Sequence, residues 1–248
     1  MRLQGKVAIV TGSGSGFGEG IARAFVREGA RVAVVDRNLG GAQRVTADLG
    51  EVAVAIGADV TVAADVAAMV ETTERRFGPL DILINNAGVG HTPQPLDTLA
   101  EETFDQIAAV NMRAIYLAAK VVVPRFKAAR RGTILNIAST GGISPRPNLT
   151  WYNASKGWVI TATRAMAIEL APFGIRVNAL NPVAGETPLL KTFIGGDTEE
   201  IRAKVLATIP LGRFSTPDDM GHAAAFLCSD EASMITGIAM EVDGGRCL

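Results

Sequence analysis

KVAIVTGSGSGFG, residues 6–18, decides the fold. Its first part, Lys6–Val10, is a run of mainly apolar and β-branched side chains, which is typical of a parallel strand buried on both faces. Its second part is a glycine-rich loop that leads at once into a predicted helix, Glu19–Glu28. Glycines at such a turn let the backbone approach a pyrophosphate, and the free N–H groups at a helix start attract negative charge. The stretch therefore predicts a dinucleotide site.

Strands and helices alternate along the rest of the chain. Strands are predicted at Lys6–Val10, Arg31–Val35, Val52–Ile56, Asp81–Ile84, Gly132–Ile137, Arg176–Leu180 and Ile238–Val242, and helices at Glu19–Glu28, Leu39–Leu49, Val62–Phe77, Phe104–Ala129 and Trp151–Phe173. This order predicts an α/β fold: a single-domain Rossmann-type doubly wound parallel sheet of about seven strands, with helices on both faces. The domain is expected to span residues 1–248. Residues 183–209 mix proline and glycine with an amphipathic stretch, Glu199–Thr208, and are predicted to form a substrate lid.

Composition narrows the function. The 248 residues are 48% hydrophobic with a net charge of −1, so the chain can bury a large core and has no basic surface for nucleic acid or an anionic membrane. We find no apolar run of membrane-spanning length and no signal segment at the start, so we expect a cytoplasmic protein. Cys228 and Cys247 form no metal-binding or disulfide pattern, so we expect two reduced thiols and no metal site.

Asp36 bears on the choice of dinucleotide. It ends the second predicted strand, about twenty residues beyond the glycine loop, where a carboxylate can accept hydrogen bonds from ribose hydroxyls. Its negative charge repels a 2′-phosphate, which favours NAD over NADP. Arg37 argues the other way because a guanidinium can bind that phosphate. Since Ser15 places no positive charge in the loop, we expect NAD as the cofactor and NADP as the disfavoured alternative.

Several motifs together resemble the short-chain dehydrogenase/reductase family. Thr11–Gly18 is similar to its TGxxxGxG signature, with Phe17 where the family usually has isoleucine, and Asn85–Gly88 matches its NNAG motif. The resemblance continues to the closing Val242–Gly245. It implies an NAD(P)-dependent enzyme whose cofactor is bound by Gly12, Ser15, Gly16, Phe17, Gly18, Asp36, Arg37, Asp59, Val60 and Asn86. In the family, the pair at Asp59 and Val60 contacts the adenine.

Tyr152 and Lys156 are four residues apart on a predicted helix, so they share one face. A tyrosine pKa near 10 is too high for a base at neutral pH, but a neighbouring ammonium and an oxidised nicotinamide would lower it. Ser139 ends the preceding strand, at the edge where ligands of parallel sheets bind. The alternative, two helix-surface residues and a capping serine, is disfavoured once the dinucleotide site is considered.

The family resemblance assigns roles to these residues. Ser139, Tyr152 and Lys156 match S…YxxxK, which implies that Tyr152 is the acid/base, that Lys156 binds the nicotinamide ribose and lowers the tyrosine pKa, and that Ser139 orients the substrate. Asn111 fits a fourth position that supports a water between the lysine and bulk solvent.

Asn181–Thr187 resembles NPGxxxT, in which the threonine region binds the nicotinamide carboxamide. Val183 replaces the family glycine, Gly185 stands where a branched residue is usual, and Thr187 still fits; Gly185 and Thr187 are expected to contact the cofactor.

The loop between Ser139 and Tyr152 is expected to border the substrate. Arg146 lies in it between two prolines, where a guanidinium could bind a substrate carboxylate; the alternative is a solvated surface charge. Glu186, beside Thr187, would oppose such an anion. His91 is a second candidate for the pocket wall, although a solvated loop histidine is the favoured interpretation.

These residues predict an NAD-dependent oxidoreductase that interconverts a secondary alcohol and a ketone on a small polar molecule: a sugar acid, a sugar or a polyol. The alternative enzyme is an NADPH-dependent 3-oxoacyl-carrier-protein reductase, for which Arg125, Lys127, Arg130 and Arg131 could form a docking surface. A non-catalytic nucleotide-sensing protein is the alternative of another class. The apolar helices Phe104–Ala129 and Trp151–Phe173 further predict a homotetramer.

Overall fold

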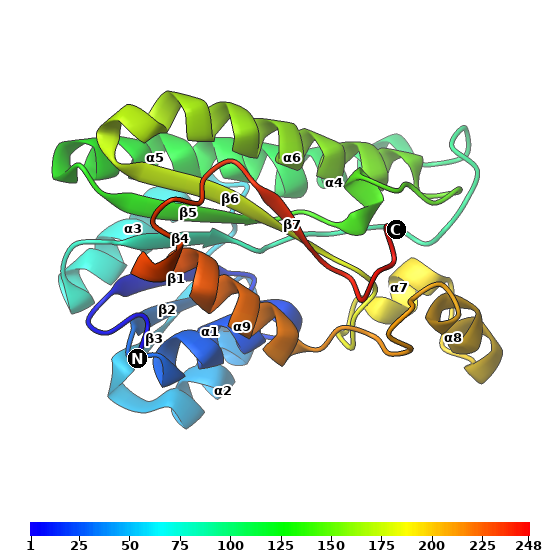
Figure 1. Cartoon of the computed structure of the whole chain (residues 1–248), viewed down its shortest axis with the longest axis horizontal. Helices are drawn as coiled ribbons and strands as arrows, with labels where there is room; N and C mark the ends of the chain where they lie inside the picture. Colours follow the sequence, from blue (N-terminus) through cyan, green and yellow to red (C-terminus); the bar gives the residue numbers. More distant parts are fainter.

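The structure, a computed structural model, describes residues 1–248 and is built on one parallel sheet of seven strands in the order β3-β2-β1-β4-β5-β6-β7 (Figure 1). The strands are β1 (Val7–Thr11), β2 (Arg31–Asp36), β3 (Ala53–Gly57), β4 (Ile82–Asn85), β5 (Gly132–Ile137), β6 (Ile175–Pro182) and β7 (Ala239–Val242). All seven lie where the sequence predicted them, with small shifts at their ends. The predicted fold class is therefore confirmed.

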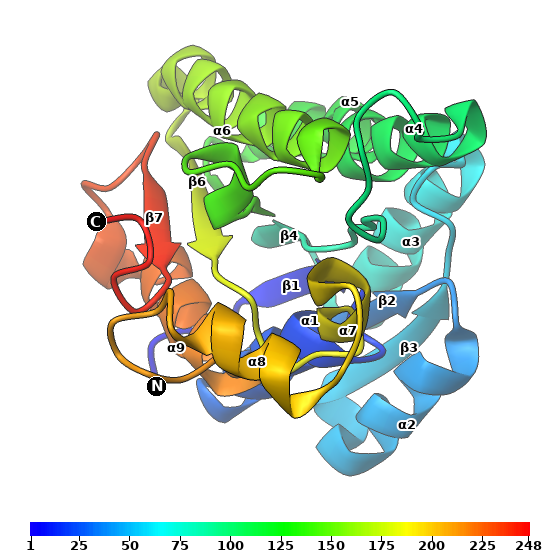
Figure 2. The same cartoon turned by 90° about the vertical axis from the view of Figure 1, so that its right-hand side faces the viewer.

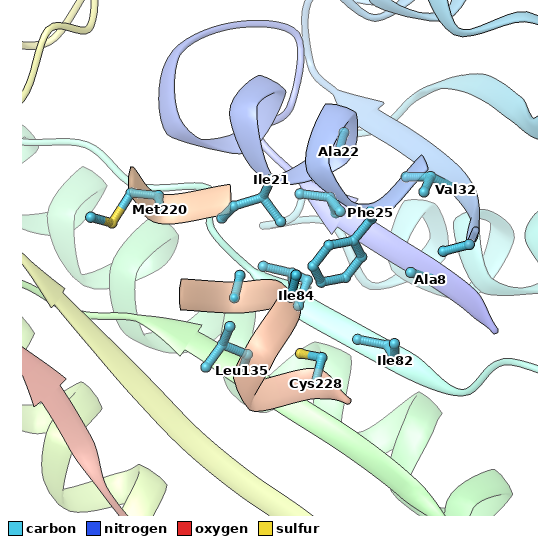
Figure 3. Close-up of a cluster of buried hydrophobic side chains, with 14 of the residues drawn as sticks. Ala8, Ile21, Ala22, Phe25, Val32, Ile82, Ile84, Leu135, Met220 and Cys228 are labelled. Atoms are coloured by element: carbon cyan, nitrogen blue, oxygen red, sulfur yellow. The ribbon is translucent and has the colours of Figure 1, made fainter. Parts of the chain in front are cut away.

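Helices cover both faces of the sheet (Figure 1). One layer contains α1 (Gly16–Arg27), α2 (Leu39–Leu49) and α9 (Pro217–Cys228), and the other contains α3 (Ala63–Phe77), α5 (Ala114–Ala129) and α6 (Thr150–Leu170). Successive strand side chains point to opposite faces, so Ala8 packs in the first core and Ile9 in the second. Figure 3 shows the first core, where Phe25 of α1 packs over the sheet beside α9.

The predicted helix Phe104–Ala129 is interrupted in its first half. It consists of α4 (Glu101–Ala108), a π-helical turn at Ala109–Arg113, and α5. By length and composition alone, Glu101–Ala129 is long and apolar enough to cross a membrane. In the fold, this stretch packs against the sheet, as the core helix of a globular protein does. The core between the sheet and the layer of α3, α5 and α6 contains its residues Leu117, Val122 and Phe126.

Two helix starts differ from the prediction. Helix α1 begins at Gly16, inside the glycine loop, rather than at Glu19. Helix α9 was not predicted, although its start carries a recognisable signal. Thr216 accepts a hydrogen bond from the Asp219 backbone N–H, the Asp219 carboxylate accepts one from Thr216, and Pro217 occupies the first helical position.

Helices α1 and α9 approach each other at two glycines. A Cβ on Gly20 would lie 2.2 Å from the Pro217 carbonyl oxygen, and a Cβ on Gly221 would lie 2.7 Å from the Ala24 Cβ. The backbone of the α9 start therefore rests directly on α1, the helix that follows the glycine loop.

The carboxyl ends of the strands form the edge that carries the site. The chain runs from β1 through β2 to β3 on one side and then returns to β4 on the other side of β1, so the strand order reverses between β1 and β4. Short helices α7 (Leu190–Ile194) and α8 (Glu199–Leu206) lie in front of this edge (Figure 2). They form the middle of residues 183–209, and α8 coincides with the predicted amphipathic stretch.

Replacing Gly20 by alanine should destabilise the fold, because the added methyl would overlap backbone rather than a movable side chain. We expect a loss of about 1–3 kcal/mol, and a decrease in Tm of roughly 2–4 °C per kcal/mol for a chain of this size. Gly40→Ala in α2 is the matched control, since its Cβ meets only the Asn38 side chain at 3.4 Å. Thermal unfolding followed by circular dichroism measures both; equal Tm values would contradict the packing argument.

Candidate active site

A cavity of about 380 Å³ lies at the carboxyl edge of the sheet. Most of the predicted site residues line it: Gly12, Ser15, Gly16, Phe17, Asp36, Arg37, Asp59, Val60, Asn86, Ser139, Arg146, Tyr152, Lys156, Gly185 and Thr187. Three predicted residues, Gly18, Asn111 and His91, lie outside its wall. The chain thus brings residues that follow six different strands to one space.

The glycine loop is fixed against the segment after β4. Asn86 Nδ2 donates hydrogen bonds to the carbonyl oxygens of Thr11 and Gly12, at 2.8 and 2.9 Å. A Cβ on Gly12 would lie 2.8 Å from the Ala87 Cα, and one on Gly18 would lie 2.3 Å from the Gly12 oxygen. Gly18 therefore allows the loop to pack closely on itself, and it does not line the cavity.

The start of α1 fits a dinucleotide phosphate. The first N–H groups of a helix have no partner within the helix, and the Ser15 side chain caps none of them. Ser15, Gly16 and Phe17 all line the cavity. A negatively charged pyrophosphate placed there would satisfy these donors and the positive end of the helix dipole.

Asp36 is positioned for a ribose. Its Oδ2 accepts from the Gly14 N–H at 2.9 Å and its Oδ1 accepts from the Asn38 N–H at 2.8 Å, which orients the carboxylate on the cavity wall. The pKa of Asp59 is lowered, chiefly by hydrogen bonds from Thr61 and to a smaller extent by the charge of Arg37. Exposed Arg37 therefore acts electrostatically on Asp59, beyond the end of β3.

Ser139, Tyr152 and Lys156 meet in the cavity, as the sequence predicted. Tyr152 and Lys156 are both buried, and Lys156 Nζ lies 5.9 Å from the centre of the Tyr152 ring. Lys156 Nζ donates to the Ile137 carbonyl oxygen at 2.9 Å, which ties α6 to the end of β5. Ser139 Oγ accepts from the Gly141 N–H at 3.0 Å. Three groups able to bind or transfer a proton thus share one water-restricted space.

The pKa of Tyr152 differs from the expectation. Burial raises it, and the groups that oppose the rise are the Ser139 hydroxyl and the Arg146 charge rather than Lys156. Burial also lowers the pKa of Lys156, to about 8. Within this chain, Tyr152 is therefore a neutral phenol at neutral pH and is ready to donate a proton.

Asn111 lies in the π-helical turn and acts as a brace. Its Nδ2 donates to the Val89 carbonyl oxygen and to Ser155 Oγ, both at 3.0 Å, and its Oδ1 accepts from the Val89 N–H at 2.9 Å. The side chain joins the loop after β4 to α6. A Cβ on Gly88 would lie 3.4 Å from Lys156 Nζ and 3.5 Å from Asn111 Oδ1, so these two side chains meet at Gly88.

One departure from the NPGxxxT pattern, Gly185, meets the departure from the TGxxxGxG pattern, Phe17, in space. A Cβ on Gly185 would lie 2.2 Å from the Phe17 ring. The Phe17 ring thus occupies the volume that a branched side chain at residue 185 would need. Thr187 lies beside the loop as well, because a Cβ on Gly16 would approach the Thr187 Cβ to 3.3 Å.

Phe193 of α7 lines the cavity and packs against Tyr152. Its ring centre lies 4.7 Å from that of Tyr152, and a Cβ on Gly90 would lie 2.1 Å from its ring. Phe193 was not predicted as a site residue. The spacing of Leu190, Phe193 and Ile194 is the pattern of an apolar helix face and could have indicated that α7 packs inward.

The two predicted substrate residues have different positions. Arg146 is half-buried on the cavity wall, and Asn153 Nδ2 donates to its carbonyl oxygen at 2.8 Å. His91 is buried away from the wall, with Nδ1 2.9 Å from the Thr92 carbonyl oxygen, so the solvated loop histidine is wrong. Arg246, from the C-terminal tail, also lines the cavity. No motif in the sequence marks it.

Comparison with known proteins agrees with this geometry. A short-chain dehydrogenase family model, described as Enoyl-(Acyl carrier protein) reductase, matches residues 12–246. The chain belongs to the short-chain dehydrogenase/reductase family. Its enzymes are NAD(P)-dependent and act on alcohol or ketone groups, so the predicted enzyme class is confirmed.

Individual members of the family are similar over their whole length. 4-Formylbenzenesulfonate dehydrogenase TsaC1/TsaC2 of Comamonas testosteroni is 44% identical, with 99% of each chain covered. Galactitol 2-dehydrogenase of Agrobacterium fabrum is 37% identical, again with 99% of each chain covered. Among solved structures, 3-ketoacyl-(acyl-carrier-protein) reductase from Brucella melitensis, complexed with NADH, is 54% identical with a TM-score of 0.94 and covers 99% of this chain and 100% of its own.

Proposed function

We propose that this protein is an NAD-dependent dehydrogenase that interconverts a secondary alcohol and a ketone on a small polar substrate. The observation that carries the proposal is the shared cavity: Ser139, Tyr152 and Lys156 lie in the same space as Asp36 and the start of α1. A non-catalytic nucleotide sensor would need neither a buried tyrosine–lysine pair nor a lid over it.

The residues divide the chemistry among them. A bound nicotinamide supplies or accepts the hydride. Tyr152 returns the proton to the reacting oxygen during reduction and removes it during oxidation, while Ser139 Oγ hydrogen-bonds that oxygen. Lys156, held by the Ile137 carbonyl, would bind the nicotinamide ribose, and Phe193 excludes water from Tyr152.

Asp36 supports NAD as the cofactor. Its carboxylate is fixed by two backbone N–H groups and faces the cavity, so a 2′-phosphate would meet a negative charge. The charge of Arg37 contributes to the lowered pKa of Asp59, a second carboxylate on the cavity wall. The NADH complex of the Brucella melitensis protein agrees with this preference.

The polar groups around Tyr152 on the cavity wall support a sugar acid, a sugar or a polyol as the substrate. The relatives named for galactitol and for 4-formylbenzenesulfonate support a small polar substrate.

The carrier-protein alternative has the name of the Brucella melitensis protein in its favour. However, the basic cluster proposed for docking lies at the end of α5, at the sheet edge opposite the cavity, and Arg125, Lys127 and Arg131 form ion pairs with Glu74, Glu169 and Asp81.

A homotetramer remains our prediction for the assembly in the cytoplasm. Tyr116 of α5 and Ile168 of α6 are 54% and 80% exposed on the outer helix layer, where a second copy could cover them. Light scattering at working concentration measures the mass, and a monomeric value would contradict the prediction.

Tyr152→Phe tests the proposed chemistry. The ring and its packing against Phe193 remain while the proton donor is lost, so turnover should fall by roughly 10²–10⁴-fold with the fold and NADH binding preserved. NADH absorbance during oxidation of a secondary-alcohol panel gives the rate, and NADH fluorescence titration gives the affinity. Activity within a few-fold of the wild-type enzyme would show that Tyr152 is not the acid/base.

Asp36→Ser tests the cofactor assignment. Loss of the ribose acceptor and of the repulsion should raise KM for NAD roughly 10- to 100-fold, while NADP becomes the comparable or better cofactor. Arg37→Ser is the control and should affect NADP more than NAD. A wild-type enzyme that already prefers NADP would contradict the assignment.

A further inference from the structure

Two arginines without a counter-ion line the same cavity. Neither Arg146 nor Arg246 takes part in an ion pair. The only acidic residues on the cavity wall are Asp36 and Asp59, at the ends of β2 and β3. The arginines follow β5 and β7, at the other side of the sheet. The wall at one end of the cavity therefore carries two arginines and no acidic residue.

Arg246 is held by a folded turn. The buried carboxylate of Asp243 accepts hydrogen bonds from the backbone N–H groups of Gly245, at 2.9 Å, and of Cys247, at 2.8 Å. These two residues flank Arg246, so its backbone is fixed although it lies close to the chain end. Figure 2 shows the tail turning after β7 and running back beside it, and Figure 1 shows the chain end next to α7.

The two arginines are also connected to each other. Arg246 Nη1 donates to Ser144 Oγ at 3.2 Å, and Ser144 belongs to the loop that carries Arg146. Asn153 of α6 holds the carbonyl oxygen of Arg146, and a proline stands on each side of that residue. The pKa of Arg146 is lowered, chiefly by burial and further by the charge of Arg246, so the guanidinium groups act on one another.

Arg146 and Arg246, we propose, form an oxoanion subsite that binds a carboxylate or sulfonate group of the substrate. The proposal rests on the dehydrogenase function above and specifies its substrate class. Planar guanidinium groups present paired N–H donors that match the oxygens of such anions. An anion bound there would relieve the repulsion between the two like charges. The substrate is thus an acid whose hydroxyl-bearing carbon faces Tyr152 and whose charged end faces the tail.

Glu186 does not oppose this anion. It lies outside the cavity wall and pairs with Arg202 of α8, at 3.8 Å. Phe193 covers Tyr152, so the part of the substrate next to the reacting carbon meets an apolar surface. The competing explanation is that Arg146 acts only on the Tyr152 proton. That role would require no negative charge on the substrate, so charged and neutral substrates distinguish the two explanations.

Binding without turnover gives the first test. The enzyme saturated with NADH is titrated by calorimetry with butanoate, propane-1-sulfonate and neutral butanamide. We expect at least one anion to bind roughly 10-fold or more tightly than the amide, and Arg246→Met to remove this preference. Arg75→Met on α3 is the matched control because Arg75 is exposed and outside the cavity. Equal affinities for the amide and the anions, or an anion preference that survives in Arg246→Met, would overturn the subsite.

Kinetics with matched alcohols give the second test. The series CH3–CH(OH)–CH2–X, with X as carboxylate, sulfonate or carboxamide, varies only the charged group. Arg246→Met should lower kcat/KM for the better anion roughly 10- to 100-fold, mainly through KM, and change the amide by less than about 3-fold. Arg246→Lys should restore part of the loss. The carboxylate and sulfonate arms identify which anion the subsite prefers.

The controls separate the two proposals. If the variants Arg146→Met and Arg246→Met slow the amide as much as the anions and shift the pH profile of kcat, the arginines act on Tyr152 and the subsite proposal fails. If wild-type enzyme oxidises the amide as well as the acids, and Tyr152→Phe abolishes both reactions, the dehydrogenase function stands without the subsite. If Tyr152→Phe leaves turnover unchanged, the proposed function itself fails.

Discussion

The carboxyl ends of β1 and β4 are held together by hydrogen bonds of the Thr11 and Asn86 side chains, and this contact leaves no room for a side chain at residue 12. Thr11 Oγ1 accepts from the backbone N–H groups of Asn86 and Ala87, and the Asn86 amide returns two bonds to the loop after β1. The close approach at Gly12 follows from this contact. It fixes the start of α1 at the point where the strand order reverses. Asp36 on one side and Tyr152 on the other then face a common space.

Much of this arrangement is predictable from local sequence because local physics determines it. Continuous β-branched runs indicate buried parallel strands, and the glycine loop indicates a backbone that must approach a phosphate. The four-residue spacing of Tyr152 and Lys156 places both on one helix face whatever surrounds the helix. The strands lie within a few residues of their predicted positions, and Tyr152 and Lys156 lie on one helix, α6.

Long-range features escaped prediction for a physical reason. Arg246 reaches the cavity only because Asp243 folds the tail, and Phe193 reaches Tyr152 only because α7 docks on Gly90. The turn at Asp243 leaves no periodic pattern in the chain, and the apolar spacing of α7 indicates an inward face without indicating which residues it contacts. The raised pKa of Tyr152 has the same origin, since burial depends on the whole fold whereas the spacing to Lys156 does not. His91 shows the converse error: a polar residue in a loop can still be packed inside.

Phe17 and Gly185 illustrate how volume is conserved across a site. Each departs from the pattern of its own motif, yet the aromatic ring at one position fills the space left by the missing side chain at the other. Bulk at both positions would force atoms together, whereas small residues at both would leave a void beside the glycine loop. A sequence comparison that scores each position separately counts two deviations from the family patterns. In the packed structure the two deviations compensate each other in volume and amount to one change.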